Sequence, residues 1–135
     1  MIGTASEANH AYVGSLGGVP VTYGAGLVER VQALSPGGVH AALDGAGGAA
    51  LEASLALVKE PGRIVTLVEH DRADSLGAQI VRGQRSAERL AELAGMYARG
   101  ELQFPVRRTY PLHEAAEAHR ELETRHGHGK VVLTV

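Results

Sequence analysis

The sequence predicts an α/β fold with a mainly parallel β-sheet, and three observations support this prediction. Short β-branched segments alternate with segments of helical periodicity along the 135 residues. The segment 63–68 is almost continuously apolar and β-branched, which is typical of a strand covered on both faces. Glycine is frequent, with 18 residues, and small residues allow helices to lie close to a sheet. Strands that alternate with helices indicate βαβ units.

The first half of the chain divides clearly into strands and helices. We expect strands where apolar or β-branched residues form short runs, at 1–4, 20–23, 39–43 and 63–68. We expect helices where apolar residues recur three or four positions apart, at 7–16, 27–34 and 49–58. Ser6 stands where the N-cap of the first helix belongs, and glycine or proline residues follow each helix.

The second half continues the alternation. The polar stretch 69–76 is expected to be a loop, and 77–81 is expected to be a short strand or a turn. Ser86 should cap a helix that continues to Arg99, with Gly100 just beyond its end. An extended segment at 103–110, a helix at 112–124 and a closing strand at 130–135 complete the predicted elements.

The composition argues against several classes of protein. Thirteen basic and 15 acidic residues give a net charge of −2, which does not favour a nucleic-acid partner or an anionic membrane surface. The absence of cysteine excludes disulfides and thiolate metal sites. No apolar run reaches the roughly 18 residues of a membrane span, and no signal-peptide pattern opens the chain. We therefore expect a cytoplasmic protein with no nucleic-acid or membrane partner.

A glycine pattern suggests a nucleotide site. Gly45-x-Gly47-x-x-Ala50 follows one predicted strand and opens a helix, and the next strand ends at Glu69. This is the spacing of a dinucleotide-binding fingerprint, in which the backbone approaches a pyrophosphate and the acidic residue binds ribose hydroxyls. On this interpretation the chain is a complete NAD-binding domain. A structural turn that packs a helix on a strand gives the same pattern in a glycine-rich chain.

Polar residues follow the other predicted strands. Ser6, Asn9 and His10 come after the first strand, and their hydroxyl and amide groups suit a phosphate better than ribose hydroxyls. An ordinary helix cap fits the same residues. Tyr23 ends the next strand, where it could cover an adenine ring, bond a phosphate or simply pack. Asp44 is more typical of a strand-end acid that bonds loop amides than of a catalytic base.

The C-terminal segment contains His126-x-His128, preceded by Arg125. No nearby acidic or sulfur ligand completes a metal-binding set, so we expect a solvated loop and no metal site. The sequence also lacks an arrangement of nucleophile, base and orienting group, so no catalytic residue is assigned.

The motifs, read in order, nevertheless carry a resemblance that covers nearly the whole chain. They are Gly3-Thr4-Ala5-Ser6-x-x-Asn9-His10, Leu43-Asp44-x-x-Gly47-Gly48, Gly62-Arg63-Ile64-Val65, Tyr110-Pro111-Leu112-x-Glu114-Ala115 and Gly129-Lys130-Val131-Val132. In this order and spacing the chain resembles the cofactor-binding half of the medium-chain dehydrogenase/reductase superfamily. The nearest branch is similar to the zinc-independent quinone oxidoreductases.

The resemblance implies an incomplete Rossmann-like parallel sheet with flanking helices, which lacks the first strand and the Gly-rich loop. Residues 1–103 would be the remainder of the NADP-binding domain, and 104–135 would return to the catalytic domain. The second and fourth strands of the family sheet would then pair with each other, or another chain would fill the gap. In relatives the strand near 77–81 often pairs across a dimer, so we expect a homodimer.

The resemblance also implies site residues near the adenosine end of the cofactor. Ser6 and Tyr23 match positions that contact the 2′-phosphate of NADPH. Asn9 stands where many relatives have lysine, so it adds no charge and leaves the preference for NADP open.

A second group of residues matches the nicotinamide end. Ala46 and Gly47 belong to the turn near the nicotinamide, and Leu67 to Glu69 match the segment beside it. Arg125 matches a tail arginine that approaches the cofactor in some relatives.

The function implied is the C-terminal cofactor-binding part of an NADPH-dependent oxidoreductase that passes hydride to a quinone or an activated enone. Its catalytic groups would lie in the part that is missing, so we expect this chain to be inactive alone. Two alternatives stay open: the complete NAD-binding domain that uses Glu69 and prefers NADH, and a non-catalytic oligomeric interaction module that binds neither cofactor.

Overall fold

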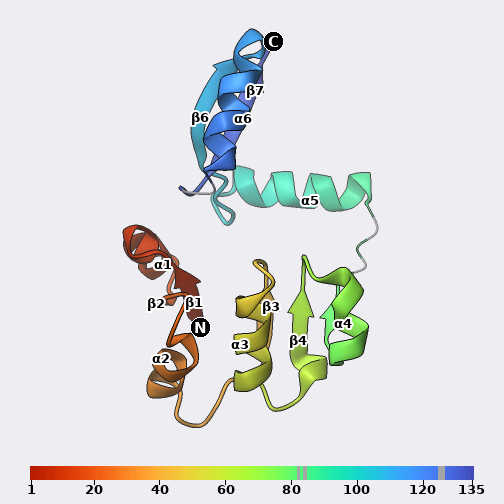
Figure 1. The fold of residues 1–135 in the computed structure, drawn as a ribbon. Helices are drawn as coiled ribbons and strands as arrows, with labels where there is room; N and C mark the ends of the chain where they lie inside the picture. Colours follow the sequence, from red (N-terminus) through yellow and green to blue (C-terminus); the bar gives the residue numbers. More distant parts are fainter. Residues whose placement is uncertain (82, 84, 125–126) are drawn as a thin grey trace. The chain divides into compact units, whose positions relative to one another are not determined.

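The computed structural model describes residues 1–81, 83, 85–124 and 127–135. The chain forms two compact units, Met1–Gly83 and Gln84–Val135 (Figure 1). The predicted helix that Ser86 caps, which we assigned to the segment 1–103, therefore belongs to the same unit as the C-terminal strands. The division at 103/104, which concerns function, stays a prediction.

The first unit contains only parallel strand pairs, as the sequence predicts. Its strands are β1 (Ile2–Ala5), β2 (Val19–Thr22), β3 (Ala42–Asp44), β4 (Ile64–Thr66) and β5 (Gln79–Ile80). β1 pairs with β2 in one sheet, and β3, β4 and β5 follow in that order in another. The two sheets do not join in the described part of the chain, so of the two expected alternatives the direct pairing of the strands that flank the gap is wrong. β5 lies at an edge of its sheet, and the homodimer expected there stays a prediction.

Helices connect these strands and supply two small cores. They are α1 (His10–Ser15), which follows a 3-10 turn at Glu7–Asn9, α2 (Leu27–Leu34), α3 (Ala49–Leu57) and α4 (His70–Leu76). Leu51 of α3 and Ile64 of β4 are fully buried in one core. Val21 of β2 and Val31 of α2 are buried in the other. The fold therefore holds α2 and α3 side by side, which positions the site described below (Figure 1).

The expected loop at 69–76 is wrong, because its residues His70–Leu76 form α4. Ala73 is fully buried and anchors this helix in the core, while Gly77 ends it with a positive φ of 68°. Arg72 also forms an ion pair with Glu52 of α3 at 2.5 Å. The sequence offered almost no apolar periodicity here, and a tertiary contact made by one small residue decides the helix.

The second unit joins one long helix to a parallel strand pair. α5 (Ala87–Ala98) begins at Ser86, whose Oγ accepts a hydrogen bond from the Arg89 amide at 3.1 Å, so the predicted cap is confirmed. β6 (Val106–Pro111) pairs in parallel with β7 (Lys130–Thr134). A 3-10 turn at Leu112–Glu114 and α6 (Ala115–Glu123) connect them. No helix in the described residues has the length and apolar character needed to cross a membrane.

A candidate cofactor-binding crevice at the carboxyl ends of the strands

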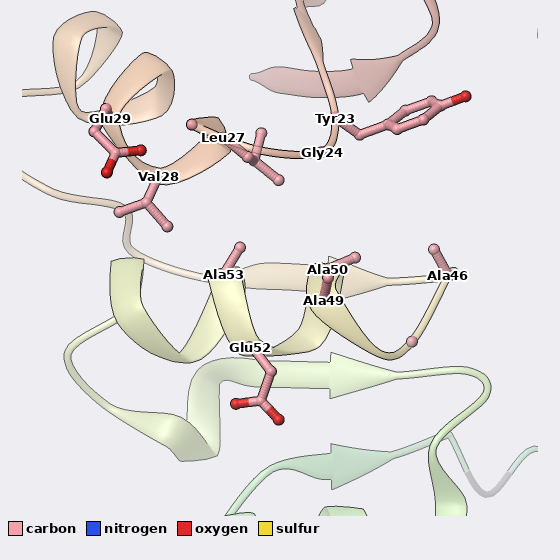
Figure 2. A pocket seen from close by; sticks show the side chains of 12 residues that line it. Tyr23, Gly24, Leu27, Val28, Glu29, Ala46, Ala49, Ala50, Glu52 and Ala53 are labelled. Atoms are coloured by element: carbon pink, nitrogen blue, oxygen red, sulfur yellow. The ribbon is translucent and has the colours of Figure 1, made fainter.

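A cavity of about 530 Å³ opens where β2 and β3 end. Tyr23 and Gly24 follow β2, while Ala46 and Gly47 follow β3, and all four line this cavity. α2 and α3 form its walls (Figure 2). Ligands of open parallel sheets bind outside the carboxyl ends of the strands. The size is within the usual range of about 300–1,000 Å³ for small-molecule sites. We call this cavity the crevice.

Small side chains keep the crevice open. Figure 2 shows Ala50 and Ala53 on the side of α3 that faces α2, while Ala46 lies in the turn below Tyr23. Alanine leaves space between the two helices that a larger side chain would fill. The one acidic residue that α3 contributes to the lining, Glu52, turns away in this view, toward its ion pair with Arg72. The walls of the crevice are therefore mainly apolar.

The turn after β3 is held by a buried carboxylate. Asp44 is 3% exposed, and its Oδ1 accepts hydrogen bonds from the amides of Ala46 at 3.1 Å and Gly47 at 2.9 Å. Its Oδ2 accepts from Thr66 Oγ1 at 2.8 Å. Burial raises the pKa of Asp44, but the three hydrogen bonds together outweigh burial and hold the pKa below its ordinary value. The expectation that Asp44 bonds loop amides is confirmed.

Glu69, at the N-cap of α4, completes this turn. Its Oε1 accepts from the Gly48 amide at 2.6 Å and lies 3.6 Å from Nη1 of Arg72. Three successive amides in the turn before α3, those of Ala46, Gly47 and Gly48, therefore have carboxylate acceptors within the protein. A pyrophosphate would have to displace those acceptors, because amides already bonded cannot also bind it. This geometry counts against the interpretation of Gly45-x-Gly47-x-x-Ala50 as a pyrophosphate loop with Glu69 on the ribose.

The ends of β1 and β2 present a different surface. Ala5 and Thr22 are register partners, so Ser6 and Tyr23 follow adjacent strand ends. Ser6 is at the N-cap position, but its hydroxyl makes no cap hydrogen bond to the helix backbone, so the predicted cap is only positional. Its Oγ instead accepts from Asn9 Nδ2 at 3.2 Å. Tyr23 is 53% exposed, so about half of its surface is accessible to a ligand.

Two basic side chains lie near these strand ends: His10 was a candidate in the sequence, whereas Arg30 was not. Arg30 of α2 donates to the carbonyl of Thr22 at 2.8 Å and to that of Ala25 at 2.9 Å. His10 Nε2 lies 3.3 Å from the Ala5 carbonyl oxygen and 3.4 Å from Thr22 Oγ1. Arg30 holds the loop after β2 in place. The only sign of this role in the sequence was the position of Arg30, one turn into the predicted helix 27–34.

The remaining predicted site residues do not gather at the crevice. Leu67 is 46% exposed, and its amide donates to the Asp44 carbonyl at 2.8 Å, but it lines the larger neighbouring groove and not the crevice. Arg125 and His126 lie outside the described residues. Among the residues that the structure describes, no group of three or more histidines, cysteines, aspartates or glutamates is placed to hold a metal ion.

Comparison with known proteins identifies the family. A family model described as zinc-binding dehydrogenase matches residues 18–133. A quinone oxidoreductase from Coxiella burnetii is similar to 99% of this chain at 30% identity, with a TM-score of 0.83 and coverage of 44% of its own chain. A mycobacterial protein complexed with NADPH shows 29% identity and a TM-score of 0.74, with coverage of 99% and 49%. No curated protein matches in sequence.

A third solved structure widens the range of cofactors. An NAD-dependent alcohol dehydrogenase has 28% identity and a TM-score of 0.80, with coverage of 99% of this chain and 43% of its own. The chain thus spans less than half the length of these three proteins. The described residues supply no ligand set for the zinc in the family description, so no step through zinc is derived. The chain belongs to the zinc-binding dehydrogenase family and has the Rossmann-like fold of the cofactor-binding half of medium-chain dehydrogenases/reductases.

Proposed function

We propose that this chain is the cofactor-binding part of an NADPH-dependent oxidoreductase that transfers hydride to a quinone or an activated enone. One observation carries the proposal: Ser6 and Tyr23, with Asn9 nearby, present uncharged polar groups at adjacent strand ends in a chain of this family. The NADPH complex of a structural neighbour supports the choice of a nicotinamide cofactor.

The adenosine end of the cofactor would meet the ends of β1 and β2. The Ser6 hydroxyl and the Asn9 amide are hydrogen-bond donors that suit a 2′-phosphate, and the exposed ring of Tyr23 offers a flat surface beside them. His10 lies close to both strand ends and offers a further hydrogen-bonding nitrogen there. A carboxylate such as Glu69, which would repel the 2′-phosphate, lies at the N-cap of α4 and is bonded there to the Gly48 amide.

The nicotinamide end would meet the turn after β3. When bound, the cofactor supplies the hydride, and the work of this chain is to position it. Ala46 and Gly47 are held rigidly by Asp44, so the backbone of the turn can orient a ring without moving. Leu67 offers an apolar surface near the same strand ends, which favours exclusion of water. The groups that face the substrate would lie in polypeptide that this chain does not contain, so we expect no quinone reduction by the chain alone.

A binding experiment tests this proposal directly. The 135-residue chain is titrated calorimetrically with NADPH and NADH, and then with adenosine 2′,5′-bisphosphate and AMP. We expect each 2′-phosphorylated ligand to bind about tenfold more tightly than its partner, because a hydrogen-bonded phosphate adds roughly 1.5 kcal/mol or more. Equal affinities would remove the NADP preference. Binding of neither cofactor would instead favour the non-catalytic interaction module.

The Glu69→Gln variant separates the proposal from the NAD-binding alternative. If Glu69 binds the ribose, the variant loses NADH affinity. In the structure Glu69 bonds the Gly48 amide instead, so we expect unchanged NADH affinity and a lower melting temperature. Glu60→Gln is the matched control, because Glu60 forms an exposed pair with Arg63 and lies outside the crevice.

A further inference from the structure

The loop after β2 carries Tyr23 and ends where α2 begins. Two of its residues, Gly24 and Gly26, have positive φ angles of 90° and 77°. Gly26 is the N-cap of α2 and has no side chain that could cap the helix. Glycine has many alternative backbone conformations, so a single conformation of this loop depends on contacts from outside it.

Arg30 of α2 supplies such contacts through its side chain. Its Nη2 donates to the Thr22 carbonyl at 2.8 Å, and its Nε donates to the same oxygen at 3.2 Å. Its Nη1 donates to the Ala25 carbonyl at 2.9 Å, and Nη2 also lies 3.4 Å from the Tyr23 carbonyl oxygen. One planar guanidinium therefore bonds the backbone on both sides of Tyr23.

The helix that carries Arg30 is itself fixed. Leu27 and Val31, its neighbours on α2, are buried in one core with Val21 of β2. The Arg30 amide donates to the Gly26 carbonyl at 3.1 Å in the first turn of the helix. Arg30 is partly buried there. Its side chain therefore joins the loop to a part of the unit that packing holds in place.

The two loops that border the crevice are held by opposite chemistry. After β3 a carboxylate, that of Asp44, accepts hydrogen bonds from loop amides. After β2 the guanidinium of Arg30 donates to loop carbonyls. Residues 45–48 of the first loop have no polar side chain. The second loop carries Tyr23, which is 53% exposed and lines the crevice, so the Arg30 bonds fix a residue that can contact a ligand.

We propose that Arg30 is a positioning residue, which fixes the phenol of Tyr23 beside the 2′-phosphate of NADPH and so sets the preference for NADPH over NADH. The inference rests on the proposed function, because it concerns the same strand ends. Lysine cannot replace Arg30 in this role. A single ammonium group lacks the planar set of donors that reaches carbonyls on both sides of Tyr23.

Calorimetric titration of the full 135-residue chain with NADPH and NADH measures this role. Arg30→Gln and Arg30→Lys should each lower NADPH affinity about fivefold and change NADH affinity by less than about twofold. Arg63→Gln is the matched control, because Arg63 forms an exposed pair with Glu60 outside the crevice. Full NADPH affinity in Arg30→Lys would show that only the charge matters, and it would overturn the positioning role.

The Tyr23→Phe variant shows whether Arg30 acts through the phenol. On its own it should lower the ratio of NADPH to NADH affinity, because it removes the phenol that Arg30 positions. Adding Arg30→Gln to Tyr23→Phe should then leave this ratio almost unchanged, because the two side chains act as one unit. Additive effects would overturn the proposal. A purely structural role of Arg30 would lower affinity for both cofactors equally and would overturn it too.

A pair of glycine variants keeps the test decisive if the Arg30 variants do not fold. A Cβ at Gly26 would lie 2.9 Å from Arg30 Nη1, so Gly26→Ala should displace the guanidinium without removing it. Gly24→Ala is the matched control, because a Cβ at this other positive φ meets nothing within 4 Å. We expect the ratio of NADPH to NADH affinity to fall about threefold in Gly26→Ala alone.

The outcomes separate this inference from the proposed function. If the unchanged chain binds neither cofactor, the proposed function fails and the role of Arg30 fails with it. If the unchanged chain prefers NADPH and that preference survives in Arg30→Gln and in Gly26→Ala, only the inference about Arg30 is overturned.

Discussion

The polar residues that follow β3 and those that follow β1 and β2 differ in burial and in how many hydrogen bonds they already make. After β3, the Asp44 carboxylate is 3% exposed and accepts three hydrogen bonds, and Glu69 closes the same turn through the Gly48 amide. After β1 and β2, Ser6 makes one side-chain contact of 3.2 Å with Asn9, and Tyr23 is 53% exposed. In the turn after β3 the carboxylates and amides are already bonded to one another, and we call it the saturated turn. The side chains after β1 and β2 can still bond a ligand.

This difference separates residues that hold the fold from residues that can bind a ligand. A buried group with all partners inside the protein is costly to change, because its partners are left without bonds. An exposed hydroxyl or phenol can exchange water for a ligand at little cost to stability. The predictions below test that contrast, beginning with the saturated turn.

Asp44→Ala should have the largest effect on stability. It leaves the amides of Ala46 and Gly47 and the Thr66 hydroxyl without their acceptor, and we expect a loss of about 3 kcal/mol in the free energy of unfolding. Urea unfolding monitored by circular dichroism measures the loss. Asp74→Ala, on the exposed side of α4, is the control and should change stability by less than about 0.5 kcal/mol. Equal effects of the two variants would contradict the saturated turn.

Gly47→Ala should be destabilising by about 2 kcal/mol. Gly47 has a φ of 71°, and an added Cβ would lie 2.9 Å from Glu69 Oε1 and 3.1 Å from Val68 Cγ2. Gly45→Ala is the matched control in the same turn, because a Cβ there meets nothing within 4 Å. Thermal unfolding of both variants checks the difference. Equal melting temperatures would show that the turn adapts and does not depend on the Glu69 contact.

The pH dependence of stability should report Asp44. Its pKa in the folded chain is below the ordinary value of 3.8, so the unfolded chain takes up the proton first as the pH falls. The stabilisation is therefore complete above the unfolded value and is lost as the pH falls through the folded pKa. The effect should be smaller than that of Asp44→Ala, because the oxygen atoms remain. Unfolding curves between pH 7 and pH 3 should show a shallower decline for Asp44→Asn.

Ser6→Ala should have the smallest effect on stability, below about 0.5 kcal/mol, because its one hydrogen bond joins two partly exposed side chains. NADPH affinity should fall by about fivefold, the equivalent of roughly 1 kcal/mol for one hydrogen bond. Ser75→Ala, in α4 and away from the crevice, is the matched control for the titration. If Ser6→Ala greatly lowered stability and left NADPH affinity unchanged, Ser6 would be a residue that holds the fold and not one that binds the ligand.

Local patterns were sufficient for much of the fold. The spacing of Leu27, Val31 and Leu34 predicted α2 with its observed bounds, and Ser86 predicted the start of α5. α4 was missed because its stability depends on the burial of Ala73, which is a contact distant in sequence. The short strand at Gln79–Ile80 agrees with one of the two expectations for that segment.

The location of the candidate site could be predicted from the sequence, but the hydrogen-bond partners of its residues could not. Parallel strands bring their carboxyl ends together, so the positions of Ser6, Tyr23 and Gly47 followed from the element order. The role of Glu69 did not follow, because the ribose and the Gly48 amide are both suitable partners for a carboxylate at that spacing. Arg30 was missed because nothing in an isolated helix shows which carbonyl groups an arginine side chain reaches.

The sequence by itself determined the alternation of strands and helices, the parallel class of the sheet and the family, because periodicity and turn residues act over a few neighbours along the chain. Only the tertiary structure decided which carboxylates are already bonded and that β1 and β3 belong to separate sheets in the described residues. Those properties depend on groups that meet across the fold, and the free energy of each contact is set by its partner, its burial and its geometry.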